Sequence, residues 1–272
     1  MESKSRSAGV PPANDSSEPI LCAENIDKRF GGLCAVSKFS ITIGDGEIVG
    51  LIGPNGAGKT TVFNLLTGAY KPDTGCIRIR GVDTLRFTPD RVTALGVART
   101  FQNIRLFKDM SVLENVMTGF QTQCKASVIA AVFRKNSYKD EEARVQREAH
   151  QLLELMGLAD KCNMLSRNLP YGAQRKLEIA RALAAAPKLL LLDEPAAGMN
   201  DTESDALQEL LREIRAKFKL SLLVIEHDMQ FVMGLVQRLL VLDHGVTIAK
   251  GTPAEVRENP TVIEAYLGKE HE

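Results

Sequence analysis

The residues most able to do chemistry in this chain form a short glycine-rich stretch that ends in a lysine and a threonine. Its spacing is that of a phosphate-binding loop, in which glycines let backbone N–H groups converge on an anion and the next helix points its positive end at the phosphates. Lys59 is then expected to neutralise the β and γ phosphates, and Thr60 to give its hydroxyl to Mg²⁺. The sequence predicts a nucleoside triphosphate site made by Gly53, Pro54, Asn55, Gly56, Ala57, Gly58, Lys59, Thr60 and Thr61.

A second candidate group is a pair of carboxylates that follows an apolar run. Residues 189–192 are all leucine, as expected of a strand covered on both faces, and Asp193 and Glu194 come directly after them. At the carboxyl edge of a sheet, Asp193 would hold Mg²⁺ and Glu194 would polarise an attacking water. Taken alone, the pattern also fits an ordinary acidic strand end. The glycine-rich stretch favours a site that hydrolyses a nucleotide.

The elements that must position these residues alternate between strand and helix. A strand is predicted at 47–52, directly before the glycine-rich stretch, and a helix at 61–66, directly after it. An amphipathic helix is predicted at 201–218. This alternation indicates an α/β fold. Further strands are predicted at 35–43, 75–80, 189–192, 222–225 and 238–243, the last joined as a hairpin to 246–249.

The chain divides into segments that differ in composition and in the periodicity of their apolar residues. Residues 1–19 are rich in Ser, Pro, Asn and charge and are expected to form a disordered tail. A folded domain is predicted over 20–268, followed by a short tail at 269–272. From 111 to 164, apolar and charged residues recur at helical spacing, which predicts a helical insertion. Together with the helix that follows it, this helical subdomain is expected to span about 111–186.

The composition excludes several classes of protein. Lys+Arg and Asp+Glu are both 34 in 272 residues, so the formal net charge is zero and a broad basic face for nucleic acid is not expected. The nearest approach to a membrane span, residues 126–133, is far too short to cross a bilayer. The five cysteines include no C-x-x-C pair, which fits reduced thiols in a cytosolic protein.

The stretch LPYGAQR (169–175) precedes the leucine strand and resembles the LSGGQ signature of ABC-type ATPases. A helix that begins there is suited to bind an anion, and Gly172 allows close backbone approach. The resemblance implies that Tyr171 and Gly172 contact nucleotide. Pro170, Tyr171 and Ala173 replace the Ser, Gly and Gln of the family pattern. Pro170 brings neither a hydroxyl nor a backbone N–H.

Three more residues follow the order of the ABC family. Gln102, in RTFQN, resembles the glutamine that reaches Mg²⁺ and the γ-phosphate and couples them to a partner. His227 resembles the switch histidine that contacts the γ-phosphate, and Phe30 lies where the family places an adenine-stacking aromatic residue. Taken alone, Gln102 also fits an ordinary loop glutamine, His227 a histidine at a strand end and Phe30 a core phenylalanine. The resemblance implies a catalytic set of Glu194, His227 and Gln102 and a metal-binding set of Thr60, Gln102 and Asp193.

Residues 99–114, 195–200, 225–228 and 265–268 are similar to ATP-binding subunits of branched-chain amino acid importers. This resemblance, over about 20–268, implies a P-loop ABC ATPase with a RecA-like α/β core, an N-terminal antiparallel β subdomain and an inserted α-helical subdomain. It implies ATP and Mg²⁺, and a second ATP-binding subunit that is either a copy of this chain or a paralogue. It also implies transmembrane permease subunits, attachment to the cytoplasmic face of the membrane and an extracytoplasmic substrate-binding protein. The solute follows from resemblance alone, since similar subunits serve urea, short amides or other amino acids.

Two other classes of protein are compatible with the phosphate-binding loop. A soluble ABC ATPase that acts on nucleic acid or ribosomes usually carries two cassettes, or coiled-coil or zinc-bearing inserts, and this sequence has none of these patterns. A small-molecule kinase leaves the signature and His227 unexplained. The resemblance favours a transport ATPase without a nucleic-acid partner. We expect it to attach to its permease through the Gln102 loop and the helical segment that begins near Ser111.

Overall fold

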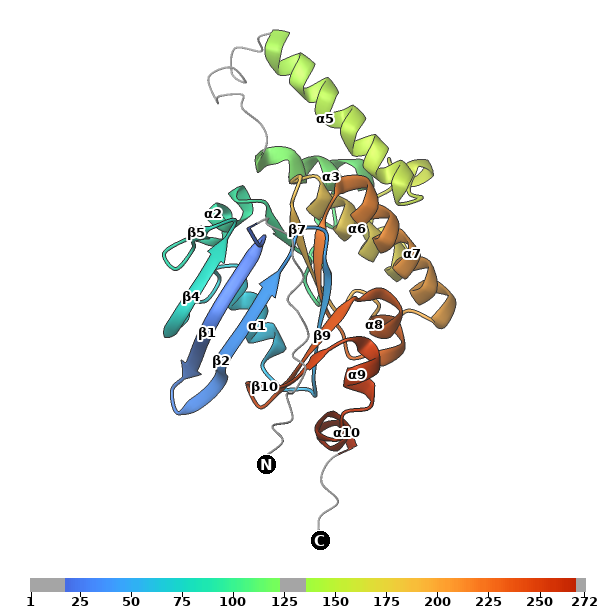
Figure 1. Ribbon diagram of the computed structural model, residues 1–272. Coiled ribbons are helices and arrows are strands. Elements are labelled where there is room, and N and C mark those ends of the chain that lie inside the picture. The colour runs from blue at the N-terminus through green and yellow to red at the C-terminus, as the bar shows by residue number, and fades with distance from the viewer. Residues whose placement is uncertain (1–17, 123–135, 268–272) are drawn as a thin grey trace, which may run out of the picture.

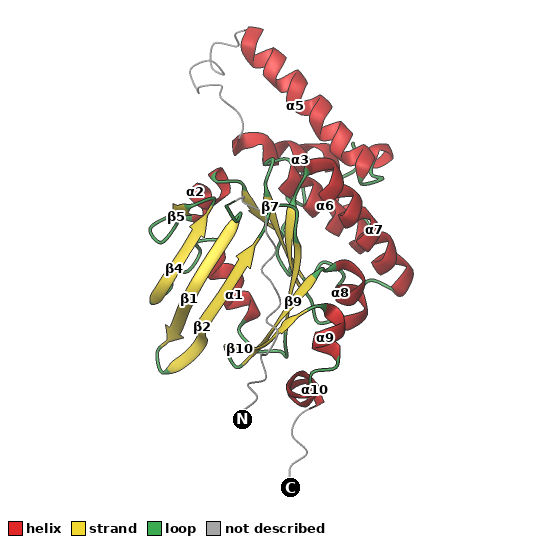
Figure 2. Ribbon diagram, viewed as in Figure 1, coloured by secondary structure: helices red, strands yellow, loops and turns green. Residues whose placement is uncertain are grey.

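A computed structural model describes residues 18–122 and 136–267. Within this part of the chain, an antiparallel sheet lies on one side, a mainly parallel sheet in the middle and most of the helices on the other side (Figures 1 and 2). The predicted tails, apart from residues 18 and 19, and the apolar run at 126–133 lie outside the described residues. The protein therefore has the α/β class that the sequence predicts.

The antiparallel sheet has the strand order β2-β1-β4-β5. Along β1 and β2, buried residues alternate with more exposed ones, because one face packs on the core and the other faces solvent. The register of β1 against β2 shifts several times between Ala23 and Arg29, and Asn25 has φ 48°. The strands are β1 (Leu21–Phe30), β2 (Leu33–Ile43), β4 (Thr74–Ile79) and β5 (Val82–Asp83).

The mainly parallel sheet has the strand order β10-β9-β3-β8-β7-β6. All of its strands run parallel except β10, which forms the predicted hairpin with β9. The carboxyl ends of parallel strands share one edge of a sheet, so the residues that follow β3, β6, β7 and β8 are brought together. The strands are β3 (Ile48–Ile52), β6 (Val97–Arg99), β7 (Leu189–Asp193), β8 (Ser221–Ile225), β9 (Arg238–Asp243) and β10 (Val246–Gly251).

The helices cover the faces of the parallel sheet. Helix α1 (Lys59–Leu66) packs between the two sheets, and α3, α5 and α6 pack on one another as a helical cluster. The other helices are α2 (Pro89–Ala94), α3 (Val112–Gly119), α5 (Asn136–Leu155), α6 (Tyr171–Leu183), α7 (Asp201–Phe218), α8 (Met229–Leu235), α9 (Pro253–Arg257) and α10 (Pro260–Leu267), with 3-10 turns at Phe120–Thr122, Ala159–Lys161 and Ser166–Asn168.

The leucines of β7 show how the middle sheet is buried. Successive residues of a strand point to opposite faces. Leu189 and Leu191 belong to the core between the two sheets, whereas Leu190 and Leu192 belong to the core under the helices. A strand covered on both faces needs apolar residues at every position, which explains the unbroken leucine run.

Most predicted elements lie where the sequence places them. Helix α7 and strand β9 have the predicted bounds, and Ala149, Leu152 and Leu153 of α5, which lies within the predicted helical insertion, are buried. Strands β1 and β6 were not predicted as separate elements. In β1 the bulges interrupt the alternation, and β6 is too short for a periodic pattern. The described cysteines are all free, and Cys124 lies outside the described residues.

Candidate nucleotide site

The glycine-rich stretch forms the loop between β3 and α1. Gly58, the N-cap of α1, has φ 102°, and a Cβ atom there would lie 2.4 Å from the carbonyl oxygen of Ala35. Only glycine fits this position, because the backbone packs directly on β2. No side chain caps the helix and its first turn holds no acidic residue. The N–H groups that begin α1 are therefore free of side-chain acceptors, and the positive end of the helix is available to an anion.

Lys59 is folded back onto this loop. Its Nζ donates hydrogen bonds to the carbonyl oxygens of Gly53 (2.6 Å) and Pro54 (2.9 Å), and the residue is 7% exposed. Burial lowers the pKa of the Lys59 amine, while the nearby carboxylates of Glu194 and Asp193 oppose this shift. The loop thus holds a cation close to both acidic residues that the sequence singles out.

Asp193, at the end of β7, is 2% exposed and paired with Arg99 of β6. Its Oδ2 lies 2.8 Å from Arg99 Nη2. Burial raises the pKa of the Asp193 carboxyl, and the hydrogen bond from Arg99 opposes that shift. Arg99 could not be assigned a role from the sequence, because no local pattern shows that the adjacent strands β6 and β7 place it against Asp193.

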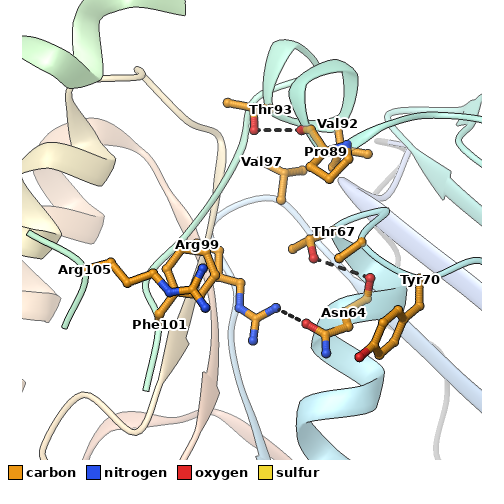
Figure 3. Close-up of a pocket in the computed structure, with 11 residues that line it drawn as sticks. Asn64, Thr67, Tyr70, Pro89, Val92, Thr93, Val97, Arg99, Phe101 and Arg105 are labelled. Carbon is orange, nitrogen blue, oxygen red and sulfur yellow. Dashed lines mark hydrogen bonds between the residues drawn. The ribbon is translucent and has the colours of Figure 1, made fainter. Parts of the chain in front are cut away.

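Arg99 also links Asp193 to helix α1. Its Nη1 donates to Asn64 Oδ1 at 2.6 Å, along one wall of a pocket of about 530 Å³ (Figure 3). The guanidinium lies 5.3 Å from the ring of Phe63 and 5.2 Å from that of Phe101, at cation–π distances. One buried cation therefore holds the ends of β6 and β7 against the helix that follows the phosphate-binding loop.

Gln102, Glu194 and His227 meet at the same edge of the sheet. Gln102 Nε2 donates to Glu194 Oε2 at 2.9 Å, and His227 Nδ1 lies 4.0 Å from Glu194 Oε1. Glu194 has φ 47°, a left-handed conformation that non-glycine residues adopt rarely, and its N–H bonds to Ile225 O of β8. His227 is mostly exposed. The three residues predicted as catalytic thus come together from three separate segments.

Glu226, beside His227, is a fully buried carboxyl that the sequence analysis missed. It accepts hydrogen bonds from the N–H groups of Ala196 (2.8 Å) and His227 (3.2 Å). Burial raises the pKa of its carboxyl, and these backbone hydrogen bonds oppose the shift. Glu226 fixes the backbone that follows β7 against the backbone that follows β8.

The signature-like stretch begins helix α6, as expected. Pro170 is the N-cap, with φ −55° and ψ 154°, and no side chain caps the helix. The ring of Tyr171 packs on Gly198, and its hydroxyl lies 3.4 Å from Arg175 Nη2. A Cβ at Gly172 would meet neighbouring side chains only at ordinary contact distances. Packing within this chain therefore does not by itself require glycine at 172.

Phe30 lies at the exposed end of β1. The residue is 43% exposed, its ring contacts Tyr70 edge-on at 5.2 Å, and Lys28 Nζ lies 5.6 Å from the ring centroid. A half-exposed aromatic ring is able to stack on a flat ligand. Phe30 is therefore not a buried core phenylalanine, which was the alternative interpretation of this residue.

A surface hollow runs beside the segment that carries Gln102. The pocket of Figure 3 shares Arg99, Phe101 and Arg105 with a second hollow of about 460 Å³ that reaches Phe107 and Arg181. We call the two together the Arg105 groove. Phe107 is half exposed in it, and the Arg105 guanidinium lies 4.0 Å from the Phe101 ring. The groove lies between the end of β6 and the helices α3 and α6.

Two further features concern metals and membranes and apply to residues 18–122 and 136–267. No group of three or more His, Cys, Asp or Glu side chains there is arranged to hold a metal ion by itself. In the same residues, no helix is long and apolar enough to span a membrane.

The sequence and the fold were compared with those of known proteins. Residues 36–197 match the family described as ABC transporter, and residues 246–272 match the family described as branched-chain amino acid ATP-binding cassette transporter. The high-affinity branched-chain amino acid transport ATP-binding protein LivG of Salmonella typhimurium is 44% identical over 253 residues, which are 93% of this chain and 99% of LivG. BraF of Pseudomonas aeruginosa, which carries the same description, is 41% identical over the same shares.

A similar solved structure is MJ1267, an ATP-binding cassette of an ABC transporter in its ADP conformation. It superposes with a TM-score of 0.80 at 32% identity, covering 93% of this chain and all of MJ1267. The similarity thus extends over both sheets and the helical cluster.

Proposed function

Because the chain belongs to the ABC transporter family, we propose that it is the ATP-binding subunit that energises a membrane importer for branched-chain amino acids. The chain binds ATP and hydrolyses it, as members of this family do. The solute, the metal, the partners and the role of each residue are parts of the proposal. Its support is the similarity to LivG and BraF, which are described as high-affinity branched-chain amino acid transport ATP-binding proteins.

The structural observation that carries the proposed hydrolysis is that the Lys59 loop follows β3, and Asp193 and Glu194 lie at the end of β7, at the same edge of the parallel sheet, where Gln102 bonds to the Glu194 carboxylate. In the proposed complex, residues 53–61 cradle the phosphates, and Lys59 exchanges its two carbonyl partners for the β and γ phosphates. Phe30, half exposed, stacks on the adenine ring. The uncapped start of α1 adds its positive end to the charge of Lys59.

For hydrolysis we assign the general base to Glu194. A water oxygen attacks the γ phosphorus, its proton passes to the Glu194 carboxylate, and ADP leaves. Gln102 occupies Oε2 of that carboxylate, so Oε1 remains for the water. His227, which lies on the Oε1 side, is assigned to contact the γ phosphate.

We propose Mg²⁺ as the metal that accompanies ATP. The Thr60 hydroxyl, the Asp193 carboxylate and the Gln102 side-chain oxygen are the oxygen donors that Mg²⁺ prefers. The described residues hold no metal-binding cluster of their own, which fits an ion shared with phosphates rather than caged by protein. When bound, Mg²⁺ would supply positive charge that neutralises the phosphates.

The start of helix α6 is proposed to close on the ATP of a second ATP-binding subunit. This helix has no side-chain cap, so its first N–H groups and its positive end are able to face a phosphate through Tyr171 and Gly172. Pro170 offers no donor there. The second subunit is therefore either a copy that pairs weakly or a paralogue that supplies a hydroxyl.

The Arg105 groove is proposed as the surface that binds the permease on the cytoplasmic face of the membrane. It exposes an aromatic ring, Phe107, and a guanidinium, Arg105, next to the segment that carries Gln102. We expect Arg105→Ala and Phe107→Ala to reduce ATP-driven uptake in the assembled transporter, while ATP binding by the isolated subunit stays unchanged. Loss of ATP binding in the isolated variants would show that this surface belongs to the nucleotide site instead.

The solute is tested in proteoliposomes that contain this chain, its co-purified permease subunits and the external binding protein. We expect ATP-dependent uptake of radiolabelled leucine, isoleucine or valine that unlabelled urea and acetamide do not compete away. Uptake of urea or an amide, with none of leucine, would overturn the branched-chain assignment and leave the transport ATPase intact. Co-purification with nucleic acid or ribosomes, and without a membrane subunit, would overturn both.

A further inference from the structure

Two fully buried charges on helix α6, Arg175 and Glu178, have no part in the mechanism described so far. Arg175 is 0% exposed and Glu178 is 1% exposed, and Arg175 Nη1 lies 2.9 Å from Glu178 Oε2. A buried ion pair contributes little net stability, because the cost of removing both charges from water offsets their attraction. The other contacts of the pair suggest what it does.

Both side chains bind the backbone of the segment that carries Gln102. Arg175 donates from Nη1 to Phe101 O at 2.7 Å and from Nη2 to Gln102 O at 2.9 Å. Glu178 Oε1 accepts from the N–H groups of Phe101 (3.4 Å) and Arg105 (3.3 Å). The pair therefore holds this segment through both carbonyl oxygens and amide groups.

The segment has few other ties between its ends. In the part of the chain that the structure describes, residues 101–106 form no hydrogen bond between two backbone groups. The segment is held on one side by Thr100, which bonds to Leu191 O of β7, and on the other by Asn115, which bonds to Phe107. Between these points, Arg175 and Glu178 supply the hydrogen bonds to the backbone.

The same guanidinium also reaches the proposed general base. Arg175 Nη2 lies 3.4 Å from Glu194 O, and the Gln102 side chain bonds to the Glu194 carboxylate at 2.9 Å. A planar guanidinium is suited to this task, because its fixed donors reach several carbonyl oxygens at once. One buried cation thus joins α6, the Gln102 segment and the backbone of Glu194.

We propose that Arg175 and Glu178 are a positioning pair that sets Gln102 and Glu194 for hydrolysis, so that movement of α6 changes both together. The proposal rests on the roles given to Gln102 and Glu194 under the proposed function. It assigns the link between the helical cluster and the reaction to these two side chains, of which Glu178 also lines the Arg105 groove.

The test is a kinetic double-mutant cycle in the assembled transporter. We expect Arg175→Met to lower kcat by up to about 100-fold, as small misplacements near a reaction do, with the ATP dissociation constant unchanged. Gln102→Ala is expected to lower kcat, and Arg175→Met is expected to lower it less in the Gln102→Ala background than in the wild type, because part of the effect of Arg175 passes through Gln102. Lys176→Met, the neighbouring cation on α6, is the matched control and is expected to leave kcat unchanged.

A second variant separates positioning from stability. Arg175→Met alone leaves the Glu178 carboxylate buried without its ion-pair partner and is expected to lower Tm, whereas Arg175→Met combined with Glu178→Met removes both charges and is expected to restore Tm. We expect kcat to stay low in this double variant, because the contacts with the Gln102 segment are still missing. Recovery of kcat together with Tm would overturn the positioning role.

The remaining outcomes also decide between the two proposals. Full additivity of Arg175→Met and Gln102→Ala, or a kcat unaffected by Arg175→Met while Gln102→Ala lowers it, would overturn the inference and leave the proposed function standing. Unchanged kcat in both Gln102→Ala and Glu194→Gln would instead overturn the proposed site itself, and the positioning role with it.

Discussion

The two sides of the nucleotide site are held in place in different ways. On one side, the phosphate-binding loop is fixed by its own sequence: a glycine that packs on β2 and a lysine that bonds to carbonyls five and six residues earlier. On the other side, the Gln102 segment is held by Arg175 and Glu178, more than seventy residues away. Function on the first side depends on a local motif, and on the second side it depends on how separate elements pack.

On the side of the phosphate-binding loop, the largest loss of ATP affinity is expected from a change at Lys59. Lys59→Ala removes the cation that faces the β and γ phosphates. Hydrogen bonds to charged groups are worth about 1.5–3 kcal/mol each, so the loss of two weakens ATP binding by about 10²- to 10⁴-fold. Titration calorimetry of the isolated chain measures this effect. Lys217→Ala, on the exposed surface of α7, is the control that keeps full affinity.

The helix that carries Arg175 and Glu178 begins at the surface proposed to bind the ATP of a second subunit, and Gly172 tests this surface. Gly172→Asp places a negative charge where the phosphate of a second subunit is proposed to bind, so ATP-dependent self-association is expected to be lost while ATP binding by the monomer is kept. Gly172→Asn has the same shape without the charge and is the matched control. Sedimentation with saturating ATP, in a Glu194→Gln background, measures the association. Equal association of the Glu194→Gln background, Gly172→Asp and Gly172→Asn would mean that residues 169–175 only begin a helix.

A smaller and opposite effect is expected at Pro170. Its backbone angles, φ −55° and ψ 154°, are open to any residue, and serine is a favoured N-cap. Pro170→Ser adds a hydroxyl that is able to reach a phosphate, so self-association tightens by about tenfold, the worth of one hydrogen bond to a charged group. The same sedimentation experiment measures it, and unchanged association would show that position 170 does not face the nucleotide.

The smallest effect concerns Glu226, which joins the two sides through the backbone after β7 and β8. Burial raises the pKa of this carboxyl in the folded state. The carboxyl therefore contributes most to stability below the pKa that it has in the unfolded chain. This contribution is lost as the pH rises through the pKa that it has in the folded state. Between pH 4.5 and pH 7, we expect the free energy of unfolding to fall less with rising pH in Glu226→Gln than in the wild type. Urea unfolding checks this, with the exposed Glu213→Gln as control; parallel pH profiles would contradict it.

The same contrast explains what the sequence could and could not predict. The phosphate-binding loop, the leucine strand and the amphipathic helix α7 were predicted because each depends on neighbours in sequence or on a regular period. Arg99, Arg175 and Glu226 were missed, because their partners lie on other strands and helices. The sequence pattern that could have indicated the buried pair is a charged residue, such as Glu178, within an otherwise apolar helix face. This pattern cannot be recognised without knowing which face of α6 is buried.

The role of Glu194 is tested most directly by measuring ATP affinity and phosphate release on the same preparation of Glu194→Gln. We expect ATP affinity to be unchanged and phosphate release to fall by about 10²- to 10⁴-fold, because the amide cannot take the proton of the attacking water. Glu213→Gln serves again as the control with normal turnover. Near-normal phosphate release by Glu194→Gln would contradict the assignment of the general base, and with it the proposed chemistry of this edge of the sheet.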